Sequence, residues 1–115
     1  MTVLSSNDKR FGKLKPKIVN DLDLDGDLIY FVDTSYERDL SEFLEEHLEA
    51  HPRGRLFVYN QHLNTLEQLM DKLYFPNGLQ LSPNKDFILI DENTKARILK
   101  FHLSGTKKGK SEVFA

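Results

Sequence analysis

Residues 19–33 read Val-Asn-Asp-Leu-Asp-Leu-Asp-Gly-Asp-Leu-Ile-Tyr-Phe-Val-Asp, and this stretch sets the pattern of the whole chain. It predicts a strand of alternating polar and apolar residues, a tight turn at residues 25–27 and a continuous apolar strand at residues 28–32. The order starts again at residues 77–91, where Asn-Gly-Leu-Gln-Leu precedes a Ser-Pro-Asn turn and a second apolar strand. The chain therefore contains a repeat of strand, turn and strand.

Two further predicted strands complete each half of this repeat. Residues 55–59 and 66–69 follow in the first half, and residues 97–103 and 112–114 follow in the second. Four strands in the same order, twice, are typical of β-propeller blades. We therefore predict an all-β fold of about two four-stranded blades. An eight-stranded sandwich or small barrel is the alternative, although its strands would not restart with the same residues at the same offsets.

The repeat also predicts the boundaries of the units. The first blade covers residues 18–74, the second covers residues 75–115, and residues 1–17 form a connector or an outer strand of a preceding blade. The first blade is longer because of an insertion, for which we predict a helix at about residues 38–50, ended by Pro52 with Gly54. One face of this helix would be apolar and would carry a packed histidine: Leu40, Phe43, Leu44, His47 and Leu48.

Composition excludes several classes of function. The 115 residues carry 16 basic and 18 acidic side chains, for a net charge of −2, so neither a nucleic-acid surface nor an anionic-membrane surface is indicated. The chain has no cysteine, which excludes disulfides and thiolate chemistry within it. No apolar run approaches the ~18 residues of a membrane span, and the sequence shows no signal-peptide core.

Two asparagines stand at equivalent positions, just before the first strand of each unit. Asn20 and Asn77 would lie at one mouth of the central channel, because the first strand of a propeller blade is innermost. A carboxamide oxygen suits Ca²⁺, so the two residues are candidate ligands of one shared ion. The alternative is that each asparagine caps a turn or ties down the start of a strand. The residues alone leave both readings open.

The acidic residues favour structural roles. Asp33 and Asp91 match in the repeat, each at the end of a second strand, where aspartate commonly bonds to the backbone of the next turn. The alternating carboxylates at residues 21, 23, 25 and 27 fail the EF-hand pattern, because the twelfth position counted from Asp21 is Val32. We interpret these four as surface carboxylates beside a turn.

The histidines show neither metal-ligand spacing nor a neighbouring nucleophile motif, so His51, His62 and His102 are predicted to be surface or strand residues. The residues alone therefore leave the catalytic groups unknown.

Four segments of the chain resemble the strictosidine synthase-like family, which includes the adipocyte plasma membrane-associated proteins. The most specific of them is Phe-Pro-Asn-Gly-Leu-Gln-Leu-Ser at residues 75–82. The resemblance runs from about Ile18 to Phe114, and the segments are residues 19–23, 29–35, 54–59 and 75–83. Residues 18–115 together look like the conserved region of that family.

The resemblance implies a six-bladed propeller, of which about four blades are not in this sequence. In the more distantly similar paraoxonases and gluconolactonases, a Ca²⁺ or similar ion is held by asparagines of successive blades and by acids of others. Asn20 and Asn77 match two of those asparagines. The whole protein would then be a metal-assisted arylesterase or lactonase, and its partners would be a small ester or lactone substrate and the remaining blades.

Two alternatives stay open beside this hydrolase: an enzyme that condenses an amine with an aldehyde, and a propeller that only binds partners. The resemblance also implies a secretory or membrane-associated location for the parent protein. Since each blade buries its faces against its neighbours, we expect this chain alone to be a fragment that folds poorly, binds Ca²⁺ weakly and is inactive.

Overall fold

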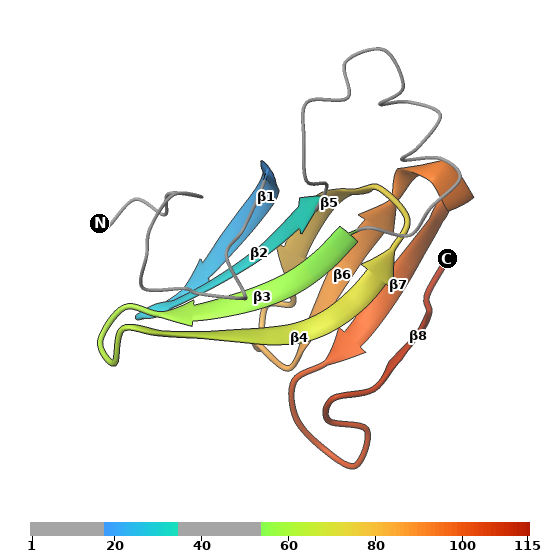
Figure 1. Ribbon diagram of the computed structural model, residues 1–115. Helices are drawn as coiled ribbons and strands as arrows, with labels where there is room; N and C mark the ends of the chain where they lie inside the picture. The colour runs from blue at the N-terminus through green and yellow to red at the C-terminus, as the bar shows by residue number, and fades with distance from the viewer. Residues whose placement is uncertain (1–17, 35–53) are drawn as a thin grey trace.

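The computed structural model describes residues 18–34 and 54–115, and these form two four-stranded sheets (Figure 1). The first sheet contains β1 (Ile18–Asp25), β2 (Leu28–Thr34), β3 (Gly54–Asn60) and β4 (Thr65–Leu73). The second contains β5 (Pro76–Leu81), β6 (Phe87–Glu92), β7 (Arg97–His102) and β8 (Ser111–Val113), with a 3₁₀ turn at Asn93–Lys95. All neighbouring strands are antiparallel and follow chain order.

This arrangement confirms the predicted all-β fold of two four-stranded units. Each unit is a meander in which sequence-adjacent strands pair, as in a propeller blade. The predicted connector at residues 1–17 and the predicted helix at about residues 38–50 lie outside the described residues.

The first hairpin shows how local sequence sets the strand order. Asp25 pairs with Leu28, so only Gly26 and Asp27 form the loop between β1 and β2. Gly26 has a φ of 58°, in the left-handed region that two-residue hairpin loops require and that glycine adopts without strain. The alternating strand before this loop and the apolar strand after it are thereby paired at once.

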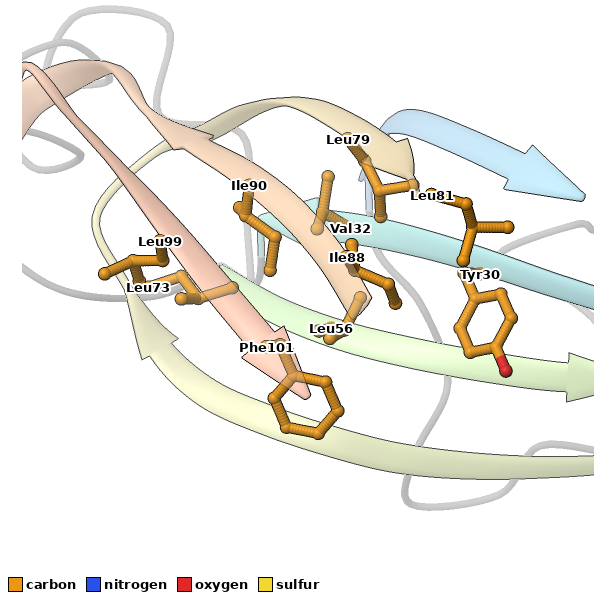
Figure 2. Close-up of a cluster of buried hydrophobic side chains, with 10 residues drawn as sticks. All are labelled: Tyr30, Val32, Leu56, Leu73, Leu79, Leu81, Ile88, Ile90, Leu99 and Phe101. Atoms are coloured by element: carbon orange, nitrogen blue, oxygen red, sulfur yellow. The ribbon is translucent and has the colours of Figure 1, made fainter. Parts of the chain in front are cut away.

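The main hydrophobic core lies between the two sheets (Figure 2). Leu56 and Val32 of the first sheet, and Ile88 and Ile90 of the second, have no exposed surface. Burying side chains of this size stabilises a fold by about 1.5–3 kcal/mol each, so this contact holds the sheets face to face. The complete cluster comprises Tyr30, Val32, Leu56, Leu73, Leu79, Leu81, Ile88, Ile90, Leu99 and Phe101.

A second apolar cluster lies on the other face of the first sheet. It contains Ile29, Phe31, Phe57 and Tyr59, and the rings of Phe31 and Phe57 stack with centroids 5.2 Å apart. The central strands β2 and β3 are therefore apolar on both faces, which is the pattern of strands that are covered on both sides.

The strand pairing corrects one predicted match between the halves. Asp33 pairs with Arg55, and the residue paired with Arg97 is Glu92, so Glu92 and not Asp91 is equivalent to Asp33. The reason lies in the first turn of each sheet. Four residues separate the paired Leu24 and Ile29, whereas six separate the paired Leu81 and Ile88. Matching by similar letters alone missed this difference in turn length.

Candidate functional site at the starts of the inner strands

Asn20 and Asn77 occupy the same kind of irregularity in their two sheets. The pairing of β1 with β2 skips Asn20 between residues 19 and 21, and the pairing of β5 with β6 skips Asn77 between residues 76 and 78. Each asparagine is thus the extra residue of a β-bulge. A bulge redirects a side chain away from the regular alternation of the strand. The sequence match predicted the equivalence but carried no signal for the bulge.

The side-chain amide of Asn20 has a fixed orientation. Its Nδ2 donates to Thr34 Oγ1 at 2.7 Å and to the backbone oxygen of Pro76 at 2.9 Å. Because a backbone carbonyl can only accept, the nitrogen and not the oxygen must face Pro76. Within the part of the chain that the structure describes, Asn20 Oδ1 has no hydrogen bond. This oxygen is available to a ligand.

Asn77 differs from Asn20 in its surroundings. Its side chain is exposed, and it makes no side-chain hydrogen bond to the residues at 18–34 or 54–115. The two asparagines are nevertheless brought close along the fold, because the amide of Asn20 binds Pro76, the residue directly before Asn77. The structure places both candidates at the starts of neighbouring inner strands.

A buried ion pair stands beside each bulge. Asp33, opposite Val19 in the pairing, accepts two hydrogen bonds from Arg55, at 3.1 Å from Nε and 2.7 Å from Nη2. Glu92, opposite Pro76, accepts one from Arg97 at 2.5 Å. Both carboxylates are fully buried, and a buried carboxylate requires such partners. These two acids therefore have structural roles in the described residues.

Glu92 also fixes the connection between the sheets. Its Oε2 accepts a hydrogen bond from the backbone nitrogen of Tyr74 at 2.7 Å, just before β5 begins. Gly54 serves the same connection from the first sheet, because a Cβ there would lie 2.3 Å from Pro76 Cδ. Only glycine allows this approach. The sequence pattern predicts only that Gly54, with Pro52, ends a helix, and it carries no signal for the contact with Pro76.

Two of the four predicted surface carboxylates are not free surface groups. Asp21 Oδ2 accepts a hydrogen bond from the backbone nitrogen of Leu79 at 2.9 Å, and Asp23 Oδ2 accepts one from Leu81 at 3.0 Å. The prediction was therefore wrong for Asp21 and Asp23, because their face of β1 meets the neighbouring inner strand β5. Among the described residues, no cluster of three or more His, Cys, Asp or Glu side chains could hold a metal.

The histidines that the structure describes lie away from the bulges. His62 is exposed, and the ring of His102 contacts Glu112 Oε1 at 2.8 Å on the β7–β8 hairpin. The hydrogen bond from His102, with Lys107 nearby, lowers the pKa of the Glu112 carboxyl. His47 and His51 lie outside the described residues.

The fold and its matched bulges place this chain among β-propeller proteins, as a pair of blades whose inner strands begin at asparagines. Comparison with known proteins identifies the family. Residues 20–106 match the strictosidine synthase family, to which this chain belongs. The family predicted from the sequence motifs is thereby confirmed.

Several similar proteins share a name. The chain is 42% identical over 114 residues to the mouse adipocyte plasma membrane-associated protein and 40% identical over 114 residues to the human one. It is 45% identical over 86 residues to adipocyte plasma membrane-associated protein Hemomucin of Drosophila melanogaster. The matches cover 97%, 97% and 75% of this chain but only 27%, 27% and 15% of the relatives, so the chain spans about a quarter or less of their length.

Among solved structures, the tricorn protease is similar over 90% of this chain and 10% of its own, with a TM-score of 0.49 and 13% identity. Within residues 18–34 and 54–115, no helix is long and apolar enough to cross a membrane.

Proposed function

We propose that this chain supplies two neighbouring blades of a propeller hydrolase, and that Asn20 and Asn77 contribute oxygen ligands to a Ca²⁺ ion at one mouth of its channel. The substrate would be a small ester or lactone. The relatives are named for association with the plasma membrane, and we propose the same location for the whole protein. The remaining blades would come from outside residues 18–115.

The observation that carries this proposal is the orientation of Asn20. Both protons of its amide are used within the protein, one by Thr34 and one by Pro76, which leaves Oδ1 directed away from both. A neutral oxygen held in this way suits Ca²⁺, which accepts six to eight oxygens at ~2.3–2.6 Å. Asn77, at the equivalent bulge, would provide a second such oxygen.

The described residues fit only part of a calcium site. They provide two neutral oxygens, while the nearby acids Asp33 and Glu92 are engaged by Arg55 and Arg97. Two amide oxygens do not offset the loss of the hydration shell of Ca²⁺. Carboxylates from other blades must therefore complete the site, and this chain alone is expected to bind Ca²⁺ weakly.

A bound ion would polarise the carbonyl of the substrate and stabilise the charge that develops on its oxygen. The role of this chain's own residues is to hold the ligand oxygens. Asn20 is fixed by Thr34 and Pro76, and a fixed ligand loses less entropy when it binds.

The proposal is tested in the full-length product of the gene that encodes this chain. We expect Asn20→Ala and Asn77→Ala each to weaken Ca²⁺ binding by about tenfold or more, measured by calorimetry, because losing one ligand costs more than ~1.4 kcal/mol. Hydrolysis of an aryl ester should fall with it and should be abolished by a chelator.

Asn84→Ala is the matched control, because Asn84 lies in the exposed turn between β5 and β6 and away from both bulges. It should bind and hydrolyse as the wild type does. Unchanged Ca²⁺ affinity in both bulge variants would refute the ligand assignment. Amine–aldehyde condensation without a metal, or binding without turnover, would instead support one of the two alternative functions.

A further inference from the structure

We propose that Asp21 and Asp23 form a carboxylate clamp that joins the inner strands of the two sheets and sets the position of β5, and hence of Asn77, relative to Asn20. The clamp stands on the hydrogen bonds of these two residues alone. Its consequence for the calcium ligands rests on the proposed function.

The clamp provides hydrogen-bond acceptors for the unpaired backbone N–H groups of the two inner strands. β1 and β5 are each the first strand of their sheet, so each has one edge without a backbone ladder. They lie side by side, yet the two sheets share no backbone pairing. A backbone N–H on such an edge loses its water when a neighbour approaches and needs another acceptor.

Each carboxylate satisfies two of these edge groups. Asp21 accepts from Leu22 N at 2.9 Å with Oδ1 and from Leu79 N at 2.9 Å with Oδ2. Asp23 repeats the arrangement with Leu24 N at 2.8 Å and Leu81 N at 3.0 Å. One oxygen serves β1 and the other serves β5. An ionised carboxylate, which only accepts and has two equivalent oxygens, suits this task.

The register of the clamp is regular. Residues 21 and 23 of β1 bind residues 79 and 81 of β5, so the partner numbers rise together and the two strands run in the same direction. Asn20 adds a third link in the same row through Pro76. Three side-chain bonds thus replace the missing ladder between the sheets.

The row ends for a chemical reason. Continuing the register would place Asp25 opposite Pro83, and proline has no N–H to donate. In the second sheet, the residues equivalent to Asp21 and Asp23 are Gly78 and Gln80. Neither of them has a carboxylate. The clamp therefore belongs to this one junction between blades and is not repeated on β5.

Amide hydrogen exchange resolved to single residues tests the clamp without reference to any metal. In the wild type, the amides of Leu79 and Leu81 should be protected although they lie on a strand edge. Asp21→Ala should accelerate exchange at Leu79 by roughly 10- to 100-fold, with Leu81 much less affected, and Asp23→Ala should do the reverse, because hydrogen bonds to charged groups contribute about 1.5–3 kcal/mol.

Asp25→Ala is the matched control from the same row of the same strand, and it should change neither amide. Protection of Leu79 and Leu81 that survives both clamp variants would overturn the proposal. So would unprotected amides in the wild type, a result that requires no variant to fold.

A second measurement separates the clamp from the calcium site. In the full-length product, Asp21→Ala should weaken Ca²⁺ binding several-fold through displaced Asn77. If exchange changes as expected while Ca²⁺ affinity does not, the clamp stands and its link to the ligands fails. If the wild type binds no Ca²⁺, only the proposed function fails.

Discussion

Asn20 and Asn77 occupy the same bulge in successive sheets, yet the first is held between β2 and β5 while the second is exposed. Two residues further along each strand, the equivalent leucines also differ in exposure. Leu22 is 43% exposed, whereas its equivalent Leu79 is 8% exposed. Each contact comes from the adjacent sheet: Asn20 is held by Pro76 of the second sheet, and Leu79 is buried against the first sheet. Local sequence determines the strands of a blade, whereas the adjacent blade determines which of its side chains are buried or hydrogen-bonded.

The ion pairs give the largest expected difference between the sheets. Arg55→Ala leaves the fully buried Asp33 without its guanidinium and should lower the free energy of unfolding by about 3–5 kcal/mol. Arg97→Ala should cost clearly less, because the Arg97 side chain is 37% exposed whereas that of Arg55 is 14% exposed. Urea denaturation of the two variants measures both values, and equal losses would contradict the stronger burial of the first pair.

Equivalent leucines of the two sheets should also differ. Leu79→Ala should destabilise the protein by about 2–4 kcal/mol, since it removes a buried side chain from the core between the sheets. Leu22→Ala at the equivalent exposed position should cost roughly 0.5 kcal/mol or less. The same denaturation experiment applies. In the 115-residue chain, a large loss at Leu22 would contradict the exposure of its face, whereas in the full-length product a further blade is expected to cover it.

A smaller effect is expected at the start of the third strand of each sheet. Gly54→Ala should cost about 1–3 kcal/mol, because the new Cβ overlaps Pro76. Ala96 precedes Arg97 as Gly54 precedes Arg55, and it has a φ of 49°, so Ala96→Gly should be neutral or stabilising by up to ~1 kcal/mol. Opposite signs in thermal unfolding are predicted, and a tolerated Gly54→Ala would contradict the close approach.

The hairpins at the outer edges give the smallest effect. The pKa of Glu112 is lowered in the folded state by His102 and Lys107, so its contribution to stability is present above the unfolded value near 4.5 and is lost as pH falls through the folded pKa. The matching β3–β4 hairpin uses the uncharged pair Tyr59 and Asn64. Melting temperatures of Glu112→Gln and wild type should differ slightly at neutral pH and converge in acid; a constant difference would refute this.

The strands were predictable because alternation and apolar runs report directly on which side chains are buried. The repeat of residues 19–33 at residues 77–91 was enough for two four-stranded units, and it also matched Asn20 with Asn77. The match of Asp33 with Asp91 failed, because a turn two residues longer shifts the register and makes Glu92 the buried acid. Letters alone do not reveal such a shift.

The rest of the site depended on contacts between the sheets. The orientation of the Asn20 amide is set by Pro76, which is 56 residues away in sequence. The carboxylates of Asp21 and Asp23 meet N–H groups 58 residues away. Their alternation was visible from the start, but the partner that turns a solvated face into a junction comes only from the packing of β1 beside β5.

The central claim is that the two bulges present oxygens to one ion. A crystal structure of the full-length gene product grown with Ca²⁺ tests it most directly. The account predicts a single ion within ~2.3–2.6 Å of both Asn20 Oδ1 and Asn77 Oδ1, with carboxylates of other blades completing the shell. An ion bound elsewhere, or two asparagine oxygens directed to opposite sides of the channel, would contradict it.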